Sequence, residues 1–325
     1  MKKRLLAAAV AAMVTLSANA ALAFPLDVTG DFRLQGRSID DGIAGGTAKD
    51  DSWFQLRTRL NFSGEVDKDT TFFGRISARN NFGAAQNSDA AFDQYGVRLK
   101  TGEWKLSIGR QAVNLGQGTI ISTGSDAAGV DNKFDGVIAS TKSGVVDLNI
   151  IAGRTDSVTA TDTSEWYGFD ASTKLSDKVT AGVSYASHKL KGGPESTQVW
   201  AINTAANLSK NFALNAEYAK SDADNDNGAY FVAGTYSQNK DSFTVQYNNV
   251  QNNSVDQYNS GIGAVAYPFW GNDLLSGNDG YKGFTYAYSH KINNNLSAHA
   301  IYMDLDVDGR SGSDKELAAG LVWGF

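Results

Sequence analysis

The stretch SWFQLRTRLNFSG, residues 52–64, alternates between apolar and polar side chains. One parity carries Phe54, Leu56, Leu60 and Phe62, and the other carries Gln55, Arg57, Arg59 and Asn61. A period of two places these sets on opposite faces of a β-strand. The stretch therefore predicts a strand that separates an apolar environment from a polar one.

The same alternation recurs along the chain. Residues 26–38 place Val28, Phe32 and Leu34 opposite Arg33 and Gln35. Sixteen strands are predicted, near residues 26–38, 52–65, 70–82, 91–100, 104–112, 133–142, 145–154, 164–174, 179–189, 195–207, 212–221, 229–238, 242–251, 280–291, 296–305 and 315–325. Short connections such as VDKD and TGE alternate with longer ones rich in Asp, Asn and Gly. An antiparallel up-and-down order would collect the short connections at one rim and the long ones at the other.

Two fold classes are compatible with so many strands: a soluble β-sandwich or solenoid, and a membrane β-barrel. Aromatic rings near strand ends favour the barrel, since such rings form girdles at the two membrane interfaces. They include Trp53, Tyr95, Trp104, Tyr167, Tyr185, Phe212, Tyr218, Tyr230, Tyr236, Tyr247, Phe284, Trp323 and Phe325. The mean hydropathy of −0.31 does not argue against lipid, because alternation hides the apolar face from an average. The predicted fold class is all-β, a single transmembrane antiparallel up-and-down β-barrel of about 16 strands.

The first residues are typical of a secretory signal peptide. Lys2, Lys3 and Arg4 precede an apolar run, and Ala21 and Ala23 form a small-x-small cleavage site. The apolar run is shorter than the roughly 20 residues that a membrane helix needs. We expect residues 1–23 to be removed and residues 24–325 to form the barrel domain.

Composition excludes several function classes. Removal of the three basic residues would make the formal net charge of −6 more negative, so nucleic acid is not an expected partner. The chain has no cysteine, which excludes disulfides and thiolate metal sites.

Two stretches resemble the bacterial general porins, the sixteen-stranded channels of the outer membrane. The first is the apolar alternating strand ELAAGLVWGF, residues 316–325. The second is LSIGRQAVNLGQGTIISTGSDAAGVDNKFDGV, residues 106–137, with Gly-Arg-Gln at 109–111 and Phe-Asp-Gly at 134–136. In porins such motifs flank a long third loop that folds into the lumen. The resemblance further implies a homotrimer in the bacterial outer membrane, and an assembly signal at Trp323 and Phe325 that the outer-membrane assembly machinery reads.

A barrel of sixteen strands is too wide for side chains to fill, so its lumen should contain water. Inward parity predicts six pore-lining arginines: Arg33, Arg57, Arg59, Arg75, Arg79 and Arg98. We expect Asp126 and Asp131 of the third loop to face them and form a charged constriction. Alternatively, the arginines are solubilising groups or partners of nearby acids. The long segment 252–279 leaves open which loop narrows the pore, and the parity of Arg110 points to lipid unless a bulge turns it inward.

The predicted function is passive diffusion of ions and small hydrophilic solutes, with no cofactor, no metal and no enzymatic activity. Its alternatives are a substrate-selective channel and a barrel-anchored surface adhesion or scaffold protein. His188, His290 and His299 are isolated in sequence and predict no catalytic centre. Asp304, Asp306 and Asp308 have the spacing of a calcium loop, but Lys315 occupies its twelfth position, so an acidic hairpin is predicted.

Overall fold

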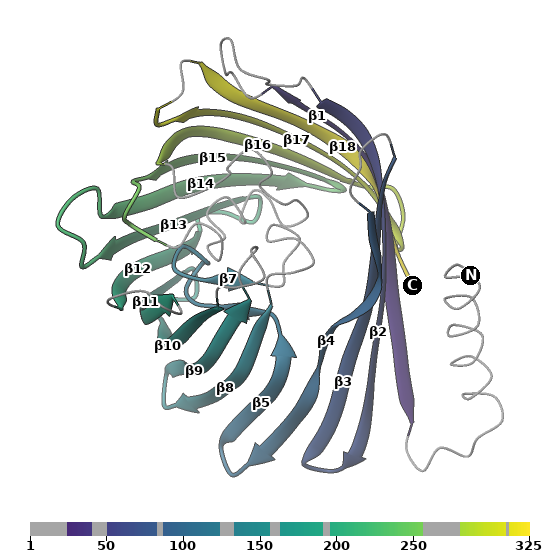
Figure 1. The fold of residues 1–325 in the computed structure, drawn as a ribbon, viewed down its shortest axis with the longest axis vertical. Helices are drawn as coiled ribbons and strands as arrows, with labels where there is room; N and C mark the ends of the chain where they lie inside the picture. The colour runs from purple at the N-terminus through teal and green to yellow at the C-terminus, as the bar shows by residue number, and fades with distance from the viewer. Residues whose placement is uncertain are drawn as a thin grey trace.

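A computed structural model describes residues 25–40, 51–82, 87–123, 133–156, 163–190, 196–255, 280–309 and 312–325 (Figure 1). The predicted signal peptide, residues 1–23, lies outside these ranges, as do Asp126, Asp131 and most of the segment 252–279. No helix in the described ranges is long and apolar enough to cross a membrane. The strands are β1 (Leu26–Asp40), β2 (Asp51–Asp67), β3 (Thr70–Phe82), β4 (Asn87–Thr101), β5 (Trp104–Gln111), β6 (Val113–Asn114), β7 (Ser122–Thr123), β8 (Phe134–Ser143), β9 (Val146–Asp156), β10 (Thr163–Lys174), β11 (Val179–Leu190), β12 (Thr197–Asn207), β13 (Phe212–Ser221), β14 (Gly228–Gln238), β15 (Asp241–Val250), β16 (Tyr281–Lys291), β17 (Leu296–Val307) and β18 (Ser313–Gly324).

Sixteen of the described strands form one closed antiparallel barrel, which confirms the predicted fold class. Each strand pairs with its neighbour in sequence, except that β5 pairs with β8 across the third loop. The barrel closes where β1 pairs with β18, at the place where purple and yellow meet in Figure 1. Closure removes the unpaired strand edges that an open sheet would expose.

The two rims differ as predicted. At one rim, connections of two to four residues join β2 to β3, β4 to β5, β8 to β9, β10 to β11, β12 to β13, β14 to β15 and β16 to β17. The remaining connections, at the opposite rim, are mostly longer, and the one between β5 and β8 holds the short strands β6 and β7. Short turns on one side and long loops on the other are the arrangement of outer-membrane barrels.

The barrel wall exposes apolar side chains and buries polar ones. On its outer face Ile202 is 63% exposed and Phe54 is 62% exposed, whereas the inward Gln35, Gln55 and Gln246 are buried. Exposed apolar area on this scale is unfavourable in water and favourable in hydrocarbon. The outer face is therefore a lipid-facing surface. Trp53 departs from the predicted girdle, because it lies on the inward parity of β2 and packs beneath Arg37, 5.2 Å from ring centre to guanidinium carbon.

Phe325 and Trp323 lie on the outer face at the seam between β1 and β18. Phe325 and Gly30 exchange two backbone hydrogen bonds of 2.9 and 3.0 Å. The Phe325 ring lies 5.6 Å from the ring of Phe32 and directly against Gly30, where a Cβ atom would come within 2.5 Å of it. Gly30 is therefore needed for the close approach of this ring.

The third loop enters the barrel. Figure 1 shows the β6–β7 hairpin inside the ring of strands, on the side of β8 to β13. Val113, Leu115, Ile120 and Ile121 of the hairpin are buried in one apolar cluster with inward residues of the wall, including Trp166 and Ala219. The predicted lumen-folded third loop is thus confirmed.

Candidate functional site

The inward face of β1, β2 and β3 concentrates arginines at the same height. Arg33 lies directly opposite Arg57, and Arg57 lies directly opposite Arg79. Directly opposed residues have Cβ atoms about 4.5–5.5 Å apart, so these guanidinium groups are close neighbours. Arginine tolerates such a row because it keeps its proton even beside like charges.

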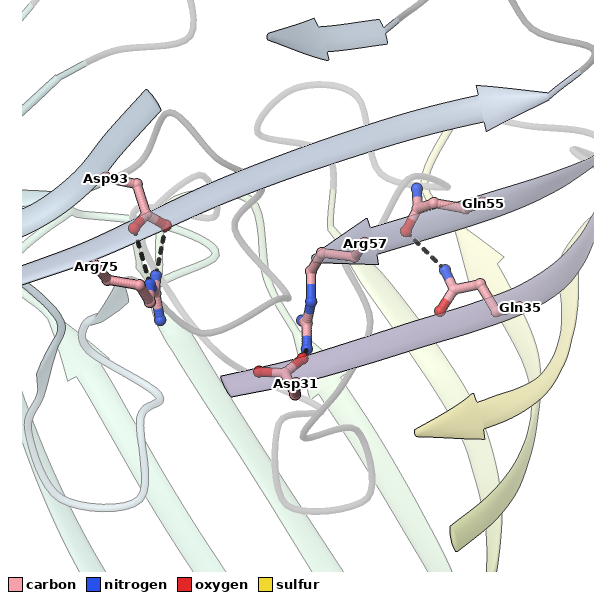
Figure 2. A network of polar contacts seen from close by, with 6 residues as sticks. All are labelled: Asp31, Gln35, Gln55, Arg57, Arg75 and Asp93. Carbon is pink, nitrogen blue, oxygen red and sulfur yellow. Dashed lines mark hydrogen bonds and ion pairs between the residues drawn. The ribbon is translucent and has the colours of Figure 1, made fainter. Parts of the chain in front are cut away.

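Two aspartates partly neutralise this row, as Figure 2 shows. Arg57 Nη2 donates to Asp31 Oδ1 at 2.5 Å. Arg75 makes a bidentate pair with Asp93, in which Nε and Nη2 donate at 2.8 and 2.6 Å. Gln35 and Gln55 join the neighbouring positions of β1 and β2 through a 2.9 Å amide hydrogen bond. Two of the inward arginines are therefore each paired with a carboxylate of a neighbouring strand.

Asp93 was missed by sequence reasoning because a β-bulge displaces it. The register of β3 against β4 shifts between Arg75 and Ile76, so Asp93 has no partner of its own in the ladder. An extra residue in one strand changes the side to which a side chain points. Asp31, in contrast, follows the simple inward parity and could have been paired with Arg57 from the sequence.

The other predicted arginines have distinct positions. Arg59 is half-buried on β2 opposite Asp31, in register with Ser77 on β3. Arg98 is exposed on β4, where its guanidinium carbon lies 4.3 Å from the centre of the Phe73 ring. This is a cation–π contact, which holds the side chain flat against the wall. The structure therefore brings five of the six arginines together and places Arg98 nearer the rim of short turns.

Arg37 shares the inward parity of Arg33 and lies where β1 pairs with β18. Its Nε donates to Glu316 Oε1 at 2.8 Å, and its Nη2 contacts the same oxygen. Both side chains are almost fully buried. The pair joins β1 to β18, the first and last strands of the barrel.

The third loop is held against the opposite wall by carboxylates. Asp170 of β10 accepts from the backbone N–H of Gly116, and Glu217 of β13 accepts from those of Gln117 and Thr119. No sequence signal in the strands indicated these contacts, because the partners are separated by 54 to 100 residues.

The motifs that flank the third loop face one another in register. Gln111 pairs with Phe134, Arg110 with Asp135 and Gly109 with Gly136. Arg110 also lies opposite Tyr95, which is on the exposed outer face. No bulge turns Arg110 inward; its Nε and Nη2 instead donate to Asp135 at 2.8 and 2.6 Å on the outside of the barrel.

The three histidines remain apart. His188 stacks on Trp166 with ring centres 4.6 Å apart, and His290 Nδ1 lies 2.8 Å from Asp241 Oδ1. His299 Nε2 lies 2.8 Å from Ser297 Oγ, a contact that a base and a nucleophile can also make. Within the described ranges, no group of three or more His, Asp or Glu side chains is placed to hold a metal ion.

A barrel of this width, apolar on the outside and charged on the inside, defines a channel for water-soluble substances across a membrane. The chain matches the Gram-negative porin family over residues 7–310 and belongs to that family. It is accordingly an outer-membrane channel for passive diffusion, and its family and fold are those of channels without enzymatic activity.

Solved structures agree with this assignment at the level of the fold. A mutant porin of Rh. blastica matches with a TM-score of 0.61 at 12% identity and covers 93% of this chain and 100% of its own. A triple mutant of the Rhodopseudomonas blastica porin has a TM-score of 0.60 at 12% identity, with the same coverage of 93% and 100%. A structure described under the asymmetric conductivity of engineered proteins has a TM-score of 0.60 at 13% identity, again over 93% and 100%. No curated protein matches the chain.

Proposed function

We propose that the arginine row of β1, β2 and β3 forms the charged wall of the pore and sets its ion preference. The observation that carries this proposal is the direct opposition of Arg33, Arg57 and Arg79 on the inward face. Asp31 and Asp93 supply two negative charges to an inward cluster that also holds Arg59 and Arg75. Among the described residues this cluster holds five arginines and two aspartates, and such an excess of positive charge attracts anions inside the low-dielectric barrel.

Replacement of Arg57, Arg59, Arg75 and Arg79 together with Ala tests this role. The reversal potential of single channels under a salt gradient should shift towards cations. A milder variant, Arg59→Gln with Arg79→Gln, keeps the ion pairs to Asp31 and Asp93 and should shift the potential in the same direction. The control variant Lys68→Ala removes a positive charge from an exposed turn outside the lumen and should leave the reversal potential unchanged. An unchanged reversal potential in both arginine variants would remove the proposal.

The lumen favours a general channel over a substrate-selective one. A selective channel would offer a continuous slide of exposed aromatic rings. Among the described residues, the inward rings of Phe73, Phe134, Trp166, Phe231 and Tyr281 are buried, and the partly buried ring of Trp53 lies beneath Arg37. We therefore propose ions and small hydrophilic solutes as the substances that pass, which liposome swelling with sugars of graded size would measure.

We propose that the chain assembles as a homotrimer through the outer face of β1, β2 and β3. Tyr and Trp favour membrane interfaces, and outward ones occur on β4, on β10 to β17 and on β18, including Tyr95, Tyr167 and Trp323. The outer face of β1 to β3 instead exposes Phe and aliphatic side chains such as Leu34 and Phe54. An apolar face that lacks the Tyr and Trp of the membrane interface differs from the rest of the lipid-facing wall, which supports contact with a protein neighbour there.

The mass of the detergent-solubilised protein tests the trimer. Light scattering should give three copies for the natural chain and one copy for Leu34→Lys. The matched change on the far side of the barrel, Ile202→Lys, should leave three copies in place. A monomeric natural protein would contradict the proposal.

We further propose that Trp323 and Phe325 form the assembly signal that the outer-membrane machinery reads, and that residues 1–23 are a cleaved signal peptide. Both aromatic rings are about half exposed on the outer face, where a binding partner can reach them. Mass spectrometry of the mature protein should show Phe24 as its first residue. Phe325→Ala should reduce the amount of barrel inserted in cells while refolding in detergent stays unchanged.

A further inference from the structure

A row of charged side chains, which we call the rim row, crosses the outer face of the barrel. Its members lie directly opposite one another on neighbouring strands: Arg110 of β5, Asp135 of β8, Arg154 of β9, Glu165 of β10 and Lys189 of β11. Each lies within two residues of the strand end at the rim of longer connections. Directly opposed residues have Cβ atoms about 4.5–5.5 Å apart, so the row is continuous.

The rim row faces away from the lumen. Arg154 shares its parity with the outward Ile150, and Glu165 shares its parity with the outward Tyr167. Arg154, Glu165 and Lys189 are all exposed. A charge on the lipid-facing side of a barrel is costly at the middle of the bilayer and costs little near its interfaces. The row therefore belongs at the level of the lipid headgroups.

The charges of the rim row do not cancel. Arg110 Nε and Nη2 donate to the two oxygens of Asp135 at 2.8 and 2.6 Å, so this pair is neutral as a unit. Arg154 and Lys189 flank one further carboxylate, that of Glu165. Because neighbouring strands are about 4.8 Å apart, these two basic residues lie roughly 10 Å apart and share a single negative charge. The excess positive charge attracts an anion to the outer face.

The same rim is acidic on the side of the barrel that β16 to β18 and β1 form, across from β9 to β11 (Figure 1). Lys282 lies opposite Asp306, and Lys315 lies opposite both Asp40 and Asp304. Two basic residues here face three acidic ones. A phosphate would therefore bind at the β9–β11 side in preference to this one.

Aromatic rings lie beneath the rim row, further from the long loops. Tyr167 is two residues from Glu165 along β10 and is 59% exposed. The ring centres of Tyr185 and Trp200 are 4.4 Å apart, and the ring of Phe169 lies 6.0 Å from each. Rings next to the interface pack against the upper part of the acyl chains. Positive charge above a group of rings matches an amphiphile with an anionic head and apolar chains.

We propose that Arg154 and Lys189 bind the phosphate of an anionic membrane lipid, whose acyl chains lie over Tyr167, Tyr185 and Trp200. The guanidinium group of Arg154 has the forked geometry that pairs with two phosphate oxygens, and the ammonium group of Lys189 adds a point charge. Glu165 lies between them and repels the phosphate, so the lipid is held reversibly. The site gives the barrel a specific lipid contact on the side away from β1 to β3.

Native mass spectrometry of the detergent-solubilised protein tests the site with three probes. Phosphatidylglycerol carries a phosphate and acyl chains, diacylglycerol carries the chains alone, and inorganic phosphate carries the anion alone. The natural protein should retain phosphatidylglycerol and neither of the other two. Equal retention of diacylglycerol would refute recognition of the phosphate. Equal retention of inorganic phosphate would refute a lipid as the ligand.

Charge variants locate the site on the barrel. The double variant Arg154→Gln, Lys189→Gln should retain phosphatidylglycerol about 30-fold more weakly, from the contribution of one basic residue near an anionic surface taken twice. Glu165→Gln should strengthen retention, because it removes the repulsion of the phosphate. The control Lys282→Gln removes a basic residue from the outer face of the same rim across the barrel and should retain the lipid as the natural protein does. Unchanged retention in the double variant, or an equal loss in Lys282→Gln, would overturn the site.

Tryptophan fluorescence tests the placement of the acyl chains without removing any charge. Phosphatidylglycerol with brominated chains should quench the natural protein, and Trp200→Phe should remove part of that quenching, because the Trp200 ring is 51% exposed beneath the rim row. Heat-modified electrophoretic mobility verifies that each variant is a folded barrel. If Trp200→Phe leaves the quenched fraction of the emission unchanged, the lipid lies elsewhere and the proposal is wrong.

Discussion

Among the described ion pairs, the buried one between Arg37 and Glu316 should contribute most to closure of the barrel. Its side chains are 1% and 0% exposed, so the change Glu316→Ala removes a charged neighbour from a guanidinium in a site closed to solvent. Breaking a buried pair in this way costs about 3–5 kcal/mol. A free-energy loss of that size changes the unfolding equilibrium by on the order of 10²–10⁴-fold.

Urea titration in detergent micelles, followed by tryptophan fluorescence, would measure this loss as a change in the free energy of unfolding. The exposed pair between Lys142 and Asp147, with a distance of 3.3 Å and side chains 63% and 56% exposed, provides the matched control. Asp147→Ala should cost about 0–1 kcal/mol, because water and salt screen an exposed pair.

The double variant Arg37→Met, Glu316→Leu sharpens the test. Replacing both members of a buried pair with apolar residues of similar volume is often neutral or stabilising. The double variant should therefore be more stable than Glu316→Ala alone. If Glu316→Ala loses no more stability than Asp147→Ala does, the reasoning about the seam is wrong.

Three further outcomes are expected. Gly30→Val should prevent normal closure of the barrel, which heat-modified electrophoretic mobility would reveal, because its Cβ would lie 2.5 Å from the Phe325 ring and 2.6 Å from a backbone oxygen. The control Gly36→Ala should be tolerated, because its Cβ would meet only a side-chain ring at 3.2 Å. Asp135→Asn should lower the melting temperature in detergent, because Arg110 loses its bidentate partner on the outer face; an unchanged melting temperature would show that lipid headgroups or water replace it. The ion preference of the natural channel should weaken between about 0.1 and 1 M salt, because the Debye length falls from roughly 10 to 3 Å, and a preference independent of salt would argue against a charged wall.

Alternation of side chains was sufficient to predict the barrel. Successive side chains of a strand point to opposite faces, and in a barrel wall one face meets lipid and the other meets water. The pattern in residues 26–38 and 52–64 therefore specifies both the strand and its inward side. Arg33, Arg57 and Arg79 share the inward parity for this reason, and they lie opposite one another in the register of β1, β2 and β3.

Features that depend on irregular backbone or on distant contacts could not be predicted in the same way. Asp93 is turned inward by a bulge that leaves no mark in the alternation. Asp170 and Glu217 could not be linked to the third loop, because nothing in the sequence of a strand indicates which loop will cover it. Trp53 was assigned to the lipid interface on its aromatic character, although its parity already placed it beside Gln55 and Arg57 on the inward face.

The seam between β1 and β18 also has a consequence for the order in which the protein folds. Arg37 and Glu316 are 279 positions apart in the chain, whereas the hydrogen bonds from the third loop to Asp170 and Glu217 span 54 to 100 positions. The entropy lost on joining two segments grows with the length of chain between them. We therefore expect the central strands to pair around the third loop first, as a curved open sheet, and β1 and β18 to pair last.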